Sequence, residues 1–327
     1  MSPACHPARV VALVPVCDGE HVLDACLDAL LETDDGCDAS QVALEVLVID
    51  DGSRDASVLV AGRRADAGRL RVLALGRNHG FAGAINRGVA FALARTTAPD
   101  VLVLVNQDCV VGRGWLAPLL AALHEPAVAV AGARLLEADG VTLQHAGARV
   151  EANGLTSHIG RGCRDPLAYR QAVDADYVCG ALLAMRTATW RRLGPFDEGY
   201  APAYFEEVDF CRRARRHGLR SVYVPTSEAV HLEASCSGRG SGLYLRRYHR
   251  SRMRFVVHHL LGGGAGLRWL RAEAKWLAGL RRWSEIAPVV AAYARLPRLV
   301  AQRAGRALAV RVRGSGRVVV QAAETPR

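Results

Sequence analysis

The chain has 327 residues, half of them apolar and 23% charged. This ordinary globular composition excludes extended disorder, and the length fits one large α/β domain or two unequal ones. The formal net charge is +10, but residues 246–327 hold 18 basic and 3 acidic residues, whereas residues 1–245 hold 24 and 29. Nucleic-acid-binding proteins usually carry positive charge on the folded body, so this distribution argues against a nucleic-acid partner.

The cysteine pattern and the chain start both point to the cytoplasm. No two of the nine cysteines have C-x-x-C spacing, and an odd total argues against a full disulfide framework, so reduced thiols are expected. Met1–Arg9 lacks the basic and then apolar pattern of a signal peptide. No run of about 18 apolar residues that could cross a bilayer is present.

Strand and helix patterns alternate over the first 110 residues. Buried strands and amphipathic helices are predicted in turn at 10–16, 22–30, 44–49, 57–64, 70–75, 81–95 and 101–105. Strict alternation predicts βαβ units, and therefore an α/β fold with a mostly parallel sheet and helices on both faces.

The pattern changes after residue 127. A strand at 127–131 precedes a Gly-rich stretch, without a clean helix, that extends to about 175. Further strands and helices are predicted at 177–185, 187–193, 207–217 and 221–231, and then helices alone at 246–260, 267–283 and 287–310. We therefore predict an α/β domain over 1–245 and a basic helical region over 246–327.

The polar residues that follow the early strands are the first candidates for a site, because ligands bind at the carboxyl ends of parallel strands. The second strand ends at Asp50-Asp51-Gly52-Ser53 and the fourth at Asn106-Gln107-Asp108. Neither a G-x-G-x-x-G motif nor a Walker A lysine is present, so dinucleotide and P-loop sites are excluded. Carboxylates can hold phosphates through a divalent cation such as Mg²⁺ or Mn²⁺, which makes Asp108 a candidate metal ligand. Asp50 is better suited to accept a hydrogen bond from a pyrimidine base.

Seven segments, in order, resemble the family-2 glycosyltransferases, which carry the GT-A fold. The segments are VVALVPVCDGEHVLDACLDALL, EVLVIDDGSRDAS, RNHGFAGAINRGVAFA, LVLVNQDCVV, QHAG, DYVCGALLAMRTATWRRLGPFDEGY and YFEEVDFCRRARRHGLRSVYVPTSEAVH. The resemblance covers roughly residues 9–258 and is greatest to the rhamnosyltransferase-like branch. It implies a catalytic GT-A domain with a nucleotide-binding half at 9–111 and an acceptor half at 112–245.

The resemblance also implies roles on the donor side. Asp50 would hold the base, and the nucleotide-sugar would be bordered by Pro15, Asp51, Asn78, Gly80, Gly83 and Asn106. Asn106-Gln107-Asp108 stands at the family's D-x-D metal motif, with Asn in place of the first acid. His231 matches a histidine that supplies a second ligand, and a His–Asp pair favours Mn²⁺ slightly over Mg²⁺.

On the acceptor side, the family's Glu-Asp-x-Asp motif is Glu206-Glu207-Val208-Asp209 here. The resemblance gives Glu207 the role of general base, with Glu206 as its substitute and Asp209 as the last acid of the motif. Glu207 is one methylene longer than the family's Asp, which changes its reach by about 1.5 Å. A misplacement of that size can cost about a hundredfold in rate.

The activity implied is inverting transfer of a sugar from a nucleotide-diphosphate sugar, of the dTDP-rhamnose or UDP-hexose type, to a hydroxyl of a cell-surface glycan or a lipid-linked acceptor. A carboxylate base and a divalent cation would assist it. Two alternatives stay open: a catalytically silent nucleotide-sugar-binding or scaffold protein, and a sugar nucleotidylyltransferase.

The basic C-terminal region mixes arginines with tryptophans between residues 267 and 283. Such helices suit an anionic membrane surface, which would make the protein peripheral on the inner face of the membrane. The alternative is that the helices pack on the catalytic domain or on a second subunit in a homo-oligomer.

Each motif also has a purely structural interpretation. Asp50 and Asp51 could form a turn, Asp108 could cap a helix, and His231 could be an ordinary strand histidine. The acids at 206–209 could begin an amphipathic helix that ends in arginines. A second D-x-D, Asp174-Ala175-Asp176, is expected to be structural or acceptor-side, and Trp115 and Trp190 are expected in the core.

Overall fold

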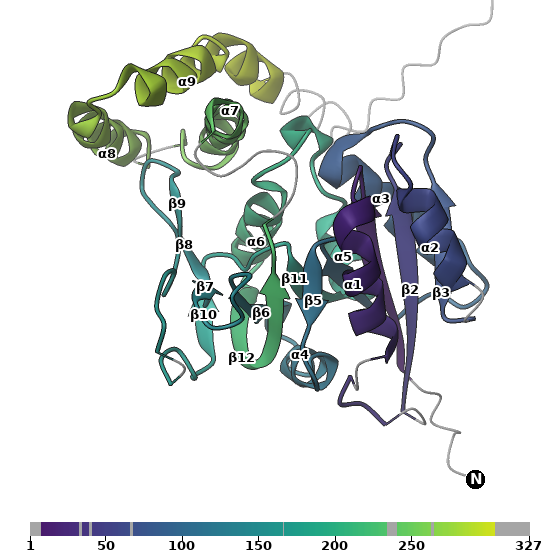
Figure 1. Cartoon of the computed structure of the whole chain (residues 1–327). Coiled ribbons are helices and arrows are strands. Elements are labelled where there is room, and N and C mark those ends of the chain that lie inside the picture. The colour runs from purple at the N-terminus through teal and green to yellow at the C-terminus, as the bar shows by residue number, and fades with distance from the viewer. Residues whose placement is uncertain are drawn as a thin grey trace, which may run out of the picture.

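The fold is centred on one mixed sheet with the strand order β10-β12-β6-β11-β4-β1-β2-β3 and with helices on both faces (Figure 1). The computed structural model describes residues 8–32, 35–38, 41–65, 68–165, 167–233, 241–262 and 265–304. Buried side chains of α1, α2 and α4 form the core on one face of the sheet, and those of α3, α5 and α6 form the core on the other.

The first half alternates strands and helices as the sequence predicts. Its elements are β1 (Ala8–Val16), α1 (Glu20–Glu32), β2 (Val42–Asp50), α2 (Ser57–Ala65), β3 (Leu70–Ala74), α3 (Gly80–Leu93) and β4 (Val101–Val105). All five side chains of β4 are buried, as expected for a strand covered on both faces. Val16 pairs with Asp50, and Asp50 with Ala74, so the carboxyl ends of these parallel strands lie level with one another.

The second half completes the sheet with shorter and partly antiparallel strands. Its elements are β5 (Cys109–Val111), α4 (Leu116–Leu123), β6 (Val128–Leu136), β7 (Leu143–His145), β8 (Ala148–Val150), β9 (Thr156–His158), β10 (Val173–Ala175), β11 (Leu182–Arg186), α5 (Thr187–Leu193), η1 (Glu198–Tyr200), α6 (Glu206–Arg216) and β12 (Arg220–His231). The predicted strand at 177–185 is shorter in the structure. Its first residues leave the sheet, and the carbonyl of Ala181 accepts a hydrogen bond from the N–H of Asn106.

The C-terminal helices are α7 (Gly242–His259), α8 (Ala265–Gly279) and α9 (Trp283–Tyr293), followed by a short helix over 296–304. Figure 1 shows them together, green to yellow, at one end of the molecule. Phe255 of α7 belongs to the core that α3 and α6 share, and the guanidinium of Arg254 pairs with Asp197 at 2.6 Å. The fold therefore has no clean break near residue 245, because α7 packs directly on the acceptor half.

Other expectations concern the core, the thiols and the membrane. Trp115 and Trp190 are buried, as predicted. The seven cysteines in the described ranges form no disulfide, and Cys5 and Cys236 lie outside those ranges. Among the described residues, no helix combines the length and the apolar character that a bilayer crossing requires.

Candidate active site

The acidic turn after β2 shapes the donor side of the site. Asp50 is buried at the end of β2, and its Oδ1 accepts the N–H of Ser53 at 3.1 Å. Asp51 uses both carboxylate oxygens at the start of α3, where it accepts the N–H groups of His79 at 2.7 Å and Gly80 at 2.9 Å. Burial raises the pKa of Asp51 despite these hydrogen bonds. Asp51 therefore anchors the loop before α3, while Asp50 remains at the strand end.

The loop before α3 meets the end of β1 at this edge. The amide nitrogen of Asn78 lies 3.1 Å from the sulfur of Cys17, and the Oε1 of Gln107 accepts the N–H of Cys17 at 2.9 Å. Cys17 follows Pro15 by two residues, at the polar end of the first strand, and the sequence alone gave it no role. Gly80 has φ +76°, and a Cβ there would lie 3.0 Å from the carbonyl oxygen of Pro202, so the position requires glycine.

Gly83, in the first turn of α3, lies close to the side chain of His79. A Cβ there would lie 2.7 Å from the Cβ of His79. The glycine therefore lets the loop fold back tightly on the first turn of α3.

Asp108 and His231, far apart in sequence, lie side by side. Cys109 of β5 pairs with His231 at the end of β12, and the imidazole Nε2 lies 3.2 Å from the Oδ1 of Asp108. The amide nitrogen of Asn106 lies 3.3 Å from the same Nε2. Both proposed ligands are buried, with 1% and 7% of their surfaces exposed, so the pair is shielded from bulk water. The β5–β12 pairing is what brings these residues together.

The chemistry of this pair fits a divalent cation. Ligands on neighbouring vertices of an octahedral ion lie about 3 Å apart when the bonds are about 2.1 Å, and the observed separation is 3.2 Å. No cluster of three or more His, Cys, Asp or Glu ligands occurs within the described ranges. A cation held by Asp108 and His231 would have coordination positions left for substrate oxygens and water.

On the acceptor side, two left-handed residues precede the glutamates. Tyr204 and Phe205 have φ of 82° and 78°, and α6 then begins at Glu206. For bulky side chains this backbone is strained, and strain of this kind concentrates at functional sites. The abrupt entry into the helix turns both glutamates inward.

The two glutamates of α6 are desolvated. Glu206 is fully buried, and its Oε1 has no hydrogen-bond partner within the described part of the chain. Burial and the neighbouring charge of Glu207 raise its pKa well above the usual range. Burial raises the pKa of Glu207, which is only partly exposed, to about 7. A carboxylate with that pKa can accept a proton near neutral pH.

The Glu207 carboxylate lies near Gly180, as does the ring of Phe81. A Cβ on Gly180 would lie 3.9 Å from the carboxyl carbon of Glu207 and 3.6 Å from the ring of Phe81, which follows Gly80 on α3. Ala181, the next residue along the chain, is the one bonded to the backbone of Asn106. The backbone at Gly180 and Ala181 thus lies next to the Glu207 carboxylate and is hydrogen-bonded to Asn106.

The carboxylate of Asp209 makes hydrogen bonds and ion pairs with three neighbouring side chains. Its carboxylate accepts from Arg213 at 2.8 Å and from Tyr200 at 3.4 Å, and it lies 2.6 Å from the Nε2 of His259 on α7. Although burial alone would raise the pKa of Asp209, the hydrogen bond from His259 and the charge of Arg213 hold it below the usual value. We assign Asp209 to holding α6 against α7.

Two more residues that sequence reasoning missed organise the site. The amide of Asn86 on α3 donates to the carbonyl of Phe196 at 2.9 Å and accepts the N–H of the same residue at 2.9 Å. It thus joins α3 to the turn at Phe196, which precedes η1. The imidazole Nδ1 of His231 lies 2.7 Å from the Oε1 of Gln144. Asn86 lies within the segment RNHGFAGAINRGVAFA, and Gln144 lies within QHAG. Their place in these family-like segments is the only feature of the sequence that could have marked the two residues as functional.

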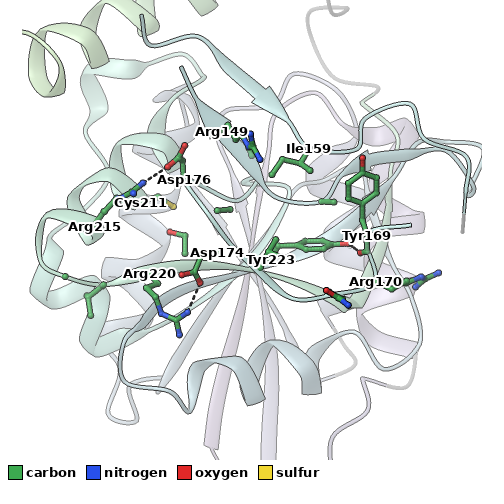
Figure 2. Close-up of a pocket in the computed structure, with 18 of the residues that line it drawn as sticks. Arg149, Ile159, Tyr169, Arg170, Asp174, Asp176, Cys211, Arg215, Arg220 and Tyr223 are labelled. Carbon is green, nitrogen blue, oxygen red and sulfur yellow. Dashed lines mark hydrogen bonds and ion pairs between the residues drawn. The ribbon is translucent and has the colours of Figure 1, made fainter. Parts of the chain in front are cut away.

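A cavity of about 1000 Å³ lies elsewhere, at the start of β12 and the end of α6 (Figure 2). Its walls carry Asp174 and Asp176, paired with Arg220 at 2.6 Å and with Arg215 respectively. Both acids of the second D-x-D are therefore engaged in ion pairs. None of the proposed catalytic or metal residues lines this cavity.

Comparison with known proteins identifies the family. The Glycosyl transferase family 2 model matches residues 11–187. An N-acetylglucosaminyl-diphospho-decaprenol L-rhamnosyltransferase of Mycobacterium tuberculosis is 28% identical over 256 residues, 73% of this chain and 80% of that protein. A low-salt glycan biosynthesis hexosyltransferase of Haloferax volcanii is 24% identical over 156 residues, 48% of this chain and 50% of its own.

Solved structures show the same fold. Staphylococcus aureus TarS 1–349 in complex with UDP-GlcNAc is similar with a TM-score of 0.58 and 14% identity, covering 89% of this chain and 81% of its own. A mannosyltransferase from Pyrobaculum calidifontis in complex with GDP-Man and Mn²⁺ has a TM-score of 0.54 and 20% identity, covering 93% and 81%. This chain, with its GT-A fold, therefore belongs to glycosyl transferase family 2, in the rhamnosyltransferase-like branch.

Proposed function

We propose that the protein is an inverting glycosyltransferase that uses Glu207 as its general base. The donor is a nucleotide-diphosphate sugar of the dTDP-rhamnose or UDP-hexose type, and the acceptor is a hydroxyl of a cell-surface glycan or lipid-linked saccharide. Two features support the proposal: the desolvated Glu207 carboxylate, whose pKa burial raises to about 7, and the contact between Asp108 and His231. The similar rhamnosyltransferase of M. tuberculosis and the hexosyltransferase of H. volcanii support the substrate class.

The acceptor hydroxyl is a weak nucleophile, so its proton must leave as the bond to the anomeric carbon forms. The Glu207 carboxylate accepts that proton, and the acceptor oxygen attacks from the face opposite the departing diphosphate. This direct displacement inverts the anomeric carbon and needs no enzyme nucleophile. Burial and the charge of Glu207 raise the pKa of Glu206 well above its usual range, which disfavours a second negative charge beside the base.

On the donor side, Asp50 accepts a hydrogen bond from the base, and the loop that Asp51 anchors borders the diphosphate. Asp108 and His231 would hold a divalent cation, which neutralises the charge that develops on the departing diphosphate. The Mn²⁺ in the similar mannosyltransferase structure supports the choice of ion. Asn106 stays within hydrogen-bond distance of the imidazole and supports its position.

A donor screen followed by a turnover assay tests this function. Purified protein is incubated with Mn²⁺ and a panel of nucleotide sugars, and the shift of the melting temperature identifies the donor, because a ligand of the native state stabilises it. Release of nucleoside diphosphate is then measured with and without a glycan or lipid-linked acceptor. Acceptor-dependent release supports transfer, whereas donor binding without release under any acceptor would mean a silent binding protein.

We further propose that the enzyme works at the inner face of the membrane. Leu267 and Leu270 of α8 and Trp283 of α9 have 64%, 56% and 72% of their surfaces exposed, close to arginines of the same region. Apolar and cationic groups together favour an anionic lipid surface. Trp276 instead lies under the guanidinium of Arg252, 4.6 Å from ring to cation, so part of the region packs inward. Sedimentation with anionic and with neutral vesicles tests this: binding that does not depend on lipid charge or salt would refute docking on an anionic membrane surface.

A further inference from the structure

We infer that Gln144 is a positioning residue that fixes the tautomer of His231 and thereby prepares its Nε2 to bind the cation. The inference rests on the proposed function, since it concerns the cation site of that function. Three contacts of one buried amide carry it. The Nε2 of Gln144 donates to the Oε2 of Glu137 and to the backbone carbonyl of His231, both at 3.0 Å, and its Oε1 lies 2.7 Å from the imidazole Nδ1.

A β-bulge explains why this side chain reaches the end of β12. On β6, Leu135 pairs with His145 and Leu136 pairs with Leu143, so Gln144 is the extra residue of β7. Bulges redirect the side chain of the extra residue and commonly lie next to active sites. Gln144 is only 1% exposed, so a wrongly oriented amide could not be satisfied by water.

The surroundings of the amide determine its orientation. A carboxylate oxygen and a carbonyl oxygen, which are both acceptors, lie next to one end, so that end must be the NH₂ group. Glu137 is itself held by Arg161, whose guanidinium lies 3.0 Å from the other carboxylate oxygen. The opposite end of the amide is therefore the oxygen, and it can only accept a hydrogen bond from the imidazole.

Consequently the Nδ1 of His231 carries the proton. A neutral imidazole has one N–H, so its Nε2 keeps a lone pair, and this atom lies 3.2 Å from the Oδ1 of Asp108. Hydrogen bonds of this kind to the distal nitrogen of a metal-binding histidine commonly orient the ring and raise its basicity. In the other tautomer the Nε2–H would donate to Asp108, and the imidazole could not bind a cation.

The test uses Gln144→Leu, which removes the acceptor at nearly constant volume. Gln171→Leu, at an exposed position, is the matched control, and His231→Ala is the ligand variant. Mn²⁺ binding in the presence of the nucleoside diphosphate is measured by electron paramagnetic resonance of the unbound ion. Gln144→Leu should weaken binding about 10- to 100-fold. The double variant with His231→Ala should lose no more than His231→Ala alone, because both changes act on one ligand.

Equal Mn²⁺ affinity in Gln144→Leu and Gln171→Leu, or additive losses in the double variant, would overturn the inference. A second measurement does not depend on the metal or on turnover. Nitrogen-15 NMR of histidine-labelled protein at about pH 8, above the ordinary titration range of histidine, should show the Nδ1–H form of His231 in the wild type and a gain of the Nε2–H form in Gln144→Leu. An Nε2–H form in the wild type would refute the role of Gln144. The Nδ1–H form in a protein that binds no Mn²⁺ would support Gln144 and contradict the cation in the proposed function.

Discussion

The donor and acceptor sides of this site hold their carboxylates differently, although burial raises the pKa of Asp51 as it does those of both glutamates, and Asp209 is hydrogen-bonded. On the donor side, Asp50 and Asp51 accept backbone N–H groups, and Asp108 lies against an imidazole. On the acceptor side, Glu206 is buried without a partner for its Oε1, and Glu207 is desolvated enough to have a pKa of about 7. Hydrogen bonding suits acids that must stay charged, whereas desolvation suits an acid that must take up a proton. The predictions below test this division, from the largest expected effect to the smallest.

Glu207→Gln should break the acceptor side most completely. Without a proton acceptor, kcat should fall about 10²- to 10⁴-fold. Because the raised pKa of Glu207 means that its ionised form is disfavoured in the fold, the stability of the wild type falls as the pH rises from about 4.5 to about 7. Gln cannot ionise, so at pH 8 the variant should melt at a higher temperature than the wild type.

The matched control is Glu206→Gln, which keeps a neutral group in the buried position. Its kcat should stay within about tenfold of the wild type. If Glu206→Gln were the more damaging of the two variants, the base would be Glu206, and the roles of the two glutamates would have to be exchanged.

Asp108→Asn should weaken the donor side. A cation held by Asp108 would contribute several kcal/mol of transition-state stabilisation, so kcat/KM should fall by about a hundredfold or more. The control is Asp176→Asn, in the ion-paired second D-x-D. Steady-state release of nucleoside diphosphate measures both variants. An Asp176→Asn enzyme with the larger loss would move the metal site to the second motif.

Asp209→Asn should separate structure from chemistry at the acceptor side. Breaking the buried pairs with Arg213 and His259 should lower the free energy of unfolding by about 3 kcal/mol. Since the pKa of Asp209 is held below its usual value, the deficit should be largest near neutral pH and shrink below about pH 4. Urea titration at several pH values measures this. A stable but inactive variant would return Asp209 to the list of catalytic candidates.

The pH dependence of kcat should report the acceptor side alone. Because Glu207 must be ionised to accept a proton and its pKa is about 7, the rate should fall about tenfold for each pH unit below that value. The profile is measured at saturating donor and acceptor. A rate that stays constant from pH 8 to pH 5 would exclude Glu207 as the titrating base.

Asn86→Ala should sharpen the comparison by loosening the joint between the two sides. Two hydrogen bonds to Phe196 are lost, each contributing about 1 kcal/mol. The melting temperature should fall by a few degrees, and the KM for the acceptor should rise more than the KM for the donor. Asn153→Ala, at a buried asparagine outside the joint, is the control: an equal rise in acceptor KM there would contradict a specific role of Asn86.

The sequence predicted the donor edge well because that edge depends on local patterns. Short apolar strands that alternate with amphipathic helices place the ends of β2 and β4 at one edge of the sheet. This placement does not depend on the contacts that the side chains make at that edge. The pattern did not reveal that Asp51 would bond the loop before α3, because the loop that it contacts lies about 28 residues further along the chain.

The remaining features depend on pairings that carry no periodic signal. The contact between Asp108 and His231 requires β5, a strand of three residues, to pair with the end of β12. Such a strand is too short to be recognised by alternation, so only the family resemblance suggested that the two residues meet. Gln144 was missed for a related reason, since its direction depends on a bulge that cannot be recognised from sequence.

The packing of α7 has a consequence for anyone who exchanges parts between relatives of this enzyme. Ser251 donates to the carbonyl of Ala203 at 3.2 Å, Arg254 holds Asp197, and His259 holds Asp209. These contacts lie on both sides of the short segment that carries Glu207, the proposed base. A hybrid joined at residue 245 would therefore combine the catalytic acids of one protein with supports shaped for another. The smallest portable unit extends at least through His259.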